Sequence, residues 1–87
     1  MRSQHIWTER DAHGSKREVR ATRFGGKWRL QAKGAGDLDW TYYERPLLAD
    51  LLALKDILFR KYQRRRASNE DVVSVEKLIA DQREAEM

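Results

Sequence analysis

Two adjacent glycines constrain the first half of this chain more strongly than any other feature. Gly25 and Gly26 separate two stretches in which apolar and polar residues alternate. Glycine accepts the positive φ values that a primed two-residue turn requires, and such a turn joins antiparallel strands. An alternation with a period of two residues is typical of a strand with one buried face. The sequence therefore predicts a β-hairpin that turns at this pair.

The glycine pair also predicts the register of the hairpin. If Phe24 lies opposite Lys27, one face of the ladder is mainly apolar. Its cross-strand pairs are Arg23 with Trp28, Ala21 with Leu30, and Val19 with Ala32. The other face is polar and consists of Glu18, Arg20, Thr22, Arg29, Gln31 and Lys33. Because the turn and the alternation select the same register, we expect the first face to pack and the second to meet solvent.

Further strands are predicted on both sides of this hairpin. Residues 5–10 form a candidate strand before a turn-rich segment at 11–15, and Trp40–Tyr43 forms another after the glycine-containing segment 34–37. Aromatic residues suit a pleated surface, and Gly, Asp and Ser suit the connections. We therefore expect a sheet region over residues 5–43.

The second half has the spacing of helices. A long helix is predicted over 46–66, with Pro46 in its first turn, and a second over 69–84, with Ser68 as its cap. One stripe of the first helix consists of Leu47, Leu51, Leu54, Leu58 and Tyr62. Leu48, Leu52 and Phe59 widen this stripe to about 160° on a helical wheel. So wide an apolar arc indicates two contacts, one with the sheet and one with a second helix or another subunit.

These elements predict the fold class. With 87 residues, of which 40% are hydrophobic and 37% charged, the chain suits one small domain over 1–87. Strands that precede helices are typical of α+β domains. We expect an antiparallel sheet of three or four strands, followed by a two-helix hairpin packed on its apolar face. The alternative is a helical hairpin that mainly builds a dimer.

Charge is distributed unevenly along the sequence. Residues 1–36 hold nine Lys and Arg against three acids, whereas residues 67–87 hold two against six. A basic surface favours polyanions. The candidate phosphate-binding cations are Arg20, Lys27, Arg29 and Lys33 of the hairpin, and Arg60, Lys61, Arg64, Arg65 and Arg66 at the end of the long helix. Against this reading, we expect Phe24 alone among the aromatics on the polar face, and stacking needs more than one.

A protein partner is the preferred hypothesis from the sequence. The wide apolar arc of the first helix and the polarised charge indicate a small noncatalytic binding or adaptor module, with self-association or a protein partner. Nucleic acid is the alternative partner. The candidate protein-binding residues are Trp40, Tyr42, Tyr43, Leu48, Leu52 and Phe59.

Catalysis, metal binding and cofactors find no support in the sequence. Cysteine is absent, His5 and His13 lie apart from any nucleophile motif, and no phosphate-cradling glycine motif is present. We expect no enzymatic activity, no metal and no cofactor. The chain also lacks an 18-residue apolar run and the pattern of a cleaved signal, so we expect a cytoplasmic protein without a membrane partner.

Overall fold

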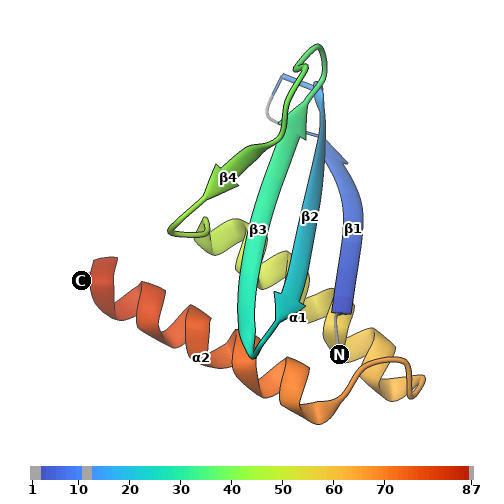
Figure 1. The fold of residues 1–87 in the computed structure, drawn as a ribbon, viewed down its shortest axis with the longest axis vertical. Helices are drawn as coiled ribbons and strands as arrows, with labels where there is room; N and C mark the ends of the chain where they lie inside the picture. Colours follow the sequence, from blue (N-terminus) through green and yellow to red (C-terminus); the bar gives the residue numbers. More distant parts are fainter. Residues whose placement is uncertain (1–2, 11–12, 87) are drawn as a thin grey trace. The chain divides into compact units, whose positions relative to one another are not determined.

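The chain forms two compact units, Met1–Pro46 and Leu47–Met87. The computed structural model describes residues 3–10 and 13–86. Four strands, β1 to β4, occupy the first unit, and two helices, α1 and α2, occupy the second (Figure 1). The predicted α+β class, with an antiparallel sheet followed by a helical hairpin, is confirmed. The packing of the hairpin on the sheet stays a prediction.

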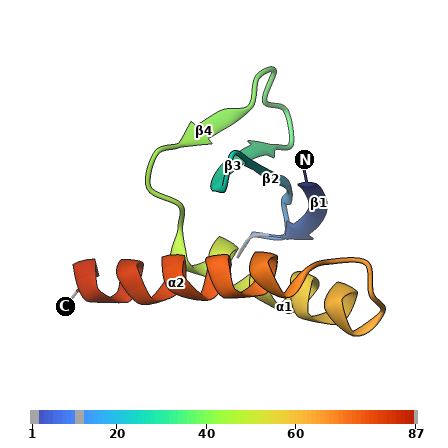
Figure 2. The same cartoon turned by 60° about the horizontal axis from the view of Figure 1, so that its bottom comes forward.

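The sheet is an antiparallel meander in which each strand pairs with its neighbour in the sequence. Its strands are β1 (Ser3–Arg10), β2 (Lys16–Phe24), β3 (Lys27–Gly34) and β4 (Thr41–Tyr43), in the order β1-β2-β3-β4. Figure 2 shows the same strands from a second direction. The short β4 pairs with β3 and brings Tyr42 opposite Gln31.

The register of β2 against β3 is the one that the glycine pair predicts. Phe24 lies opposite Lys27, and Ala21 lies opposite Leu30. Gly25 and Gly26 have φ values of 61° and 80°, which a type I′ turn requires at both central positions. The local turn chemistry and the observed pairing therefore agree.

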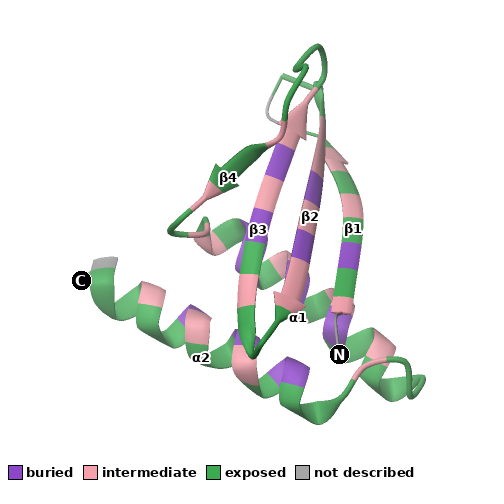
Figure 3. Ribbon diagram, viewed as in Figure 1, coloured by how far each residue is buried: buried purple, intermediate pink, exposed green. Residues whose placement is uncertain are grey.

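Burial separates the two faces of the sheet. The apolar face contains the buried residues Val19, Ala21, Leu30 and Ala32, with His5 from β1. Along β2 and β3 these residues alternate with half-buried or exposed ones (Figure 3). We call the opposite side the polar face; on β2 and β3 it consists of Lys16, Glu18, Arg20, Thr22, Phe24, Lys27, Arg29, Gln31 and Lys33. Since successive side chains of a strand point to opposite sides, one register fixes both faces.

The second unit is a hairpin of two helices that pack on each other. The helix α1 (Leu48–Gln63) and the helix α2 (Asn69–Glu86) run in opposite directions (Figures 1 and 2). Their buried apolar residues are Leu51, Leu54 and Leu58 from α1 and Val72, Val75 and Ile79 from α2. The three- and four-residue spacing of these positions places them on one side of each helix.

The helix ends differ in part from the prediction. Pro46 lies before α1, whose N-cap is Leu47, because the helical hydrogen bonds begin with the N–H of Leu51 donating to the carbonyl of Leu47. At α2 the predicted cap is confirmed: the Oγ of Ser68 accepts a hydrogen bond of 3.1 Å from the backbone N–H of Asp71. This bond satisfies a donor that the first turn leaves without a helical partner.

The carboxyl end of α1 closes with a Schellman motif. The N–H of Arg66 donates to the carbonyl of Lys61 at 2.7 Å, and the N–H of Arg65 donates to that of Tyr62 at 2.9 Å. Arg65 has a φ of 60°, a left-handed conformation that glycine usually provides at this position. The motif stops the helix within the basic run, which we define as Arg60–Arg66.

Candidate functional site

The polar face of the sheet gathers cations from two neighbouring strands. Lys16 and Arg20 lie on β2, and Lys27, Arg29 and Lys33 lie on β3. Side chains two residues apart on one strand are about 6.6 Å apart along it, so the row from Lys27 to Lys33 extends over about 20 Å. Lys16, Lys27 and Arg29 are exposed, and the others are half-buried. These cations therefore share one face of the sheet.

An aromatic ring lies among these cations. The Cζ atom of Arg20 is 4.1 Å from the ring centroid of Trp40, which is within the range of a cation–π interaction. The Nε of Arg20 is buried and has no hydrogen-bond partner within residues 3–10 and 13–86. The indole therefore covers part of the guanidinium and brings Trp40 onto the polar face.

Trp40 and Tyr42 also belong to the polar face, so the expectation that Phe24 is the single aromatic residue there is wrong. Tyr42 lies opposite Gln31, a polar-face position, and is 51% exposed. Phe24 is 70% exposed beside the turn. The pattern of the β2–β3 hairpin predicts neither the register of β4 nor the contact between Trp40 and Arg20. As a result, the polar face combines cations with aromatic surfaces.

Among the described residues, two groups on the polar face line hollows. One hollow, of about 220 Å³, is lined by Lys16, Glu18, Lys33, Gly34, Ala35 and Trp40. The other, of about 430 Å³, is lined by Thr22, Phe24, Lys27 and Arg29 near the turn. Each hollow thus has at least one aromatic wall and at least one cation, which is the composition expected where a base and a phosphate bind together.

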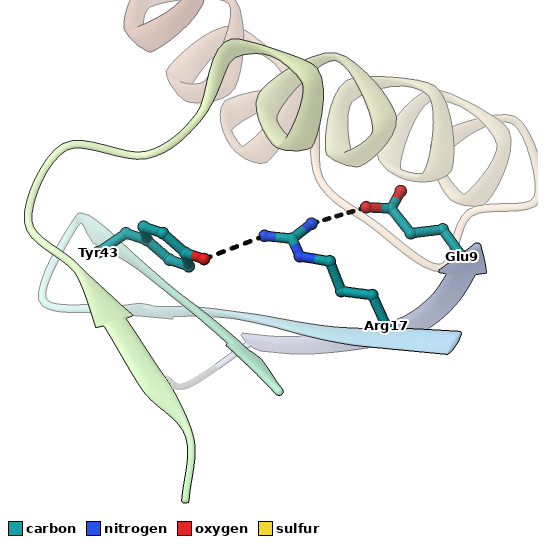
Figure 4. Close-up of polar contacts among 3 residues, drawn as sticks. All are labelled: Glu9, Arg17 and Tyr43. Atoms are coloured by element: carbon teal, nitrogen blue, oxygen red, sulfur yellow. Dashed lines mark hydrogen bonds and ion pairs between the residues drawn. The ribbon is translucent and has the colours of Figure 1, made fainter. Parts of the chain in front are cut away.

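Tyr43, predicted to bind a protein, belongs to a cluster that links three strands. Arg17 on β2 forms an ion pair of 2.6 Å between its Nη1 and the Oε1 of Glu9 on β1. Its Nη2 donates a hydrogen bond of 3.4 Å to the hydroxyl of Tyr43 on β4 (Figure 4). The guanidinium Cζ also lies 5.8 Å from the centroid of the tyrosine ring. These contacts give Tyr43 a structural role in the sheet.

The basic run at the end of α1 does not share the geometry of the sheet cations. Arg60 forms an ion pair of 2.8 Å with Asp56 one turn earlier, and Arg64 is the C-cap residue. Arg60 and Lys61 lie within α1, where successive residues are rotated by about 100°, so these two cations point in different directions. Arg65 and Arg66 lie beyond the helix, in the Schellman motif. Cations at a helix carboxyl terminus also interact favourably with the helix dipole. The run therefore has a local structural explanation.

The α1 candidates for protein binding form a second feature. Leu52 is 41% exposed and Phe59 48% exposed, and Leu48 is half-buried. The spacing of four and seven residues places Leu48, Leu52 and Phe59 on one side of α1, and we call them the α1 apolar line. Tyr62, three residues beyond Phe59, extends it and is 43% exposed.

Asp37 and His5 carry groups that catalysis commonly uses, and both make structural contacts here. Asp37 closes the turn after β3, since its Oδ2 accepts a hydrogen bond of 2.8 Å from the N–H of Gly34. His5 is buried, with its ring centroid 5.9 Å from that of Trp28. Among the described residues, no three His, Cys, Asp or Glu side chains group together as metal ligands would.

Sequence reasoning missed two parts of this site. Lys16 was not named as a phosphate-binding candidate, although its even spacing from Glu18 and Arg20 places all three on one face. Trp40 was considered for protein binding, and no sequence signal places it over Arg20. The period of two residues along the strand is enough to identify Lys16. The position of Trp40 depends on the path of the loop before β4.

Comparisons with models of known protein families, with curated proteins and with solved structures found no match to this chain. Neither helix in the described part of the chain is both long and apolar enough to cross a membrane. A function is therefore inferred from the residues and geometry of this chain.

Proposed function

We propose that this chain is a noncatalytic nucleic-acid-binding module that uses the polar face of its sheet. The observation that carries the proposal is the convergence of Lys16, Arg20, Lys27, Arg29 and Lys33 on one side of two paired strands. Trp40 and Tyr42 supply aromatic surfaces on that side. Cations bind phosphates and aromatic rings stack on bases, so the two residue types together fit a nucleic acid better than a simple anion.

The charge of the chain supports this reading. The formal net charge is +4, and Met1–Pro46 accounts for it, with ten Lys and Arg against six Asp and Glu. A phosphate backbone that follows β3 meets Lys27, Arg29 and Lys33 in turn. Each neutralised phosphate releases bound counterions, so binding weakens as salt rises. Specificity for a base requires a further contact with a base edge.

The test is a titration of fluorescently labelled oligonucleotides at several salt concentrations. For three or four contacts with a single strand, we expect the slope of log K against log salt to be about −2 to −3. The double variant Arg29→Gln, Lys33→Gln removes two contacts, so we expect a slope smaller by about 1.4. Its affinity at low salt falls by about tenfold.

The matched control is the double variant Arg64→Gln, Arg66→Gln, which removes the same charge from exposed positions of the basic run. We expect this variant to keep the slope of the wild type. An equal loss in both double variants would contradict a site on the polar face. The absence of binding by the wild type at low salt would end the proposal.

A second candidate function is self-association through the α1 apolar line. The exposed fractions of Leu52 and Phe59 favour it, because neighbouring exposed apolar side chains on one helix face often mark a protein contact. A second copy also offers charge complementarity, since residues 67–87 hold six acids against two bases and the basic run holds five cations. We propose the cytoplasm as the location for either function.

Light scattering over a range of protein concentrations tests self-association. We expect the measured mass of the wild type to rise above the 10.3 kDa of a monomer as the concentration increases. We expect the double variant Leu52→Ser, Phe59→Ser to stay a monomer. The control is Ile6→Ser, which removes an exposed aliphatic residue from the sheet. A monomer at high concentration in the wild type contradicts this candidate.

A further inference from the structure

The hollow beside Trp40 has a lining that differs from the rest of the polar face. Its volume is about 220 Å³, below the roughly 300 to 1,000 Å³ typical of sites for drug-sized ligands. The lining combines an aromatic ring, two lysines and one carboxylate, together with the backbone of Gly34 and Ala35. A cavity of this size and composition suits one ring system and its attached phosphate.

Trp40 is held so that it forms a wall of this hollow. The guanidinium of Arg20 lies over the indole at 4.1 Å, and Trp40 directly precedes β4. A ring that is already ordered loses little conformational freedom when a ligand stacks on it. Aromatic side chains that stack on bases are a common means of binding unpaired nucleotides. The indole therefore gives the hollow a surface for a nucleobase.

Glu18 is the carboxylate in the lining of this hollow. It lies between Lys16 and Arg20 along β2 and opposite Lys33 on β3. A carboxylate repels a phosphate but accepts two parallel hydrogen bonds through its two oxygens. Among the bases, guanine presents two adjacent N–H donors on its Watson–Crick edge, at N1 and at the 2-amino group. In a duplex this edge is used in pairing, so the carboxylate reaches it when the guanine is unpaired.

The two lysines of the hollow complete the arrangement. Lys16 and Lys33 line it from β2 and β3, and both lie on the same face as Glu18. With the base edge at Glu18 and the ring against Trp40, the flanking phosphates fall near cations. Each part of an unpaired guanine nucleotide then meets a group of matching chemistry.

We infer that the hollow lined by Trp40, Glu18, Lys16 and Lys33 binds an unpaired guanine within a single-stranded nucleic acid. This inference rests on the proposed function and names the kind of nucleic acid that the polar face prefers. Glu18 determines the preference for the base, and Trp40 contributes to the affinity for any base.

The test compares labelled eight-nucleotide strands: all thymidine, the same strand with one central guanine, and the same strand with inosine in that place. Inosine lacks the 2-amino group and keeps N1–H. We expect the guanine strand to bind wild-type protein about tenfold more tightly than the thymidine strand, and inosine to lie between them. Corresponding RNA strands of uridine with one guanosine show whether the sugar matters, and a duplex containing the guanine strand is expected to lose the preference.

Glu18→Gln keeps the size of the side chain and removes the pair of carboxylate acceptors. We expect this variant to bind the guanine and thymidine strands equally while it keeps wild-type affinity for thymidine or exceeds it. The matched control is Glu9→Gln, the same change on the apolar face, which we expect to retain the guanine preference. Trp40→Leu is expected to weaken binding of every strand.

The outcomes separate this inference from the proposed function. If wild-type protein binds the guanine and thymidine strands equally with a normal salt slope, the inference is wrong and the proposed function stands. If Glu18→Gln keeps the guanine preference, Glu18 is not the selective group and the inference is again wrong. If Glu18→Gln fails to fold, the wild-type comparison of guanine with inosine and thymidine decides. If no strand binds at low salt, the proposed function fails as well.

Discussion

The sheet unit and the helical hairpin contain similar numbers of charged residues and arrange them differently. Met1–Pro46 has ten Lys and Arg against six acids, and Leu47–Met87 has eight against eight. In the sheet, alternation places Lys27, Arg29 and Lys33 on one face. In the hairpin, Arg64 to Arg66 follow one another around the end of α1.

This difference shows why a basic run in a sequence is a weak guide to a binding surface. A period of two residues sorts alternating side chains onto two faces, whereas consecutive residues on a helix point in directions about 100° apart. Arg60 and Lys61 lie within α1, whereas Arg64 to Arg66 lie in the motif that ends it, so no single period aligns the five cations of the basic run. Spacing that matches the element decides whether charges act together.

The largest expected effect on stability comes from truncating a buried leucine side chain in either unit. Leu30 in the sheet and Leu54 in the hairpin are both 0% exposed. We expect Leu30→Ala and Leu54→Ala each to lower the free energy of unfolding by about 2 to 5 kcal/mol, measured by urea denaturation. If the two units form the predicted single domain, both variants shift one shared transition. Two separate transitions, each sensitive to one variant, would contradict that prediction.

The turn between β2 and β3 has the next largest expected effect. Gly26 has a φ of 80°, and a Cβ added there meets nothing within 4 Å. We expect Gly26→Ala to lower the free energy of unfolding by about 1 to 2 kcal/mol, because the left-handed conformation itself disfavours a side chain. Thermal unfolding followed by circular dichroism measures this loss. An unchanged midpoint would mean that the turn is not held in this conformation.

The cap of α2 has a somewhat smaller expected effect. Ser68 accepts the backbone N–H of Asp71 at 3.1 Å, and alanine cannot replace this bond. We expect Ser68→Ala to lower the free energy of unfolding by about 1 kcal/mol. Ser68→Asp serves as the control in urea denaturation, because aspartate is an equally good cap and should keep wild-type stability. An equal loss in both variants would exclude capping as the cause.

The smallest effect has the opposite sign. Arg65 adopts a φ of 60° at the end of α1, where glycine avoids the steric cost. We expect Arg65→Gly to raise the free energy of unfolding by about 0.5 to 1 kcal/mol, after the greater freedom of glycine in the unfolded chain is subtracted. Arg64→Gly, at a residue with a φ of −94°, should lower the stability. A loss in both variants would show that the side chain of Arg65 contributes more than its backbone costs.

The sequence predicted the sheet better than it predicted the site. The pairing of Phe24 with Lys27 and the cap at Ser68 follow from residues close together in the chain, and both are confirmed. Pro46 was predicted in the first turn of the long helix, but it precedes Leu47, the N-cap of α1. Helix boundaries depend on which carbonyl accepts the first helical hydrogen bond, and here it is that of Leu47. Asp50 is 1% exposed, and the sequence did not predict this burial because charged residues usually lie at the surface.

The amino-acid sequence alone determined the hairpin, its register and the side on which each β2 and β3 residue lies, because a glycine turn and a period of two leave one consistent arrangement. Tertiary structure decided that Trp40 covers Arg20 and that a hollow forms beside Glu18. That contact joins residues twenty positions apart through a loop whose path no local pattern specifies. Local geometry therefore set the charges on the polar face, and a long-range contact gave that face the aromatic ring of its candidate site.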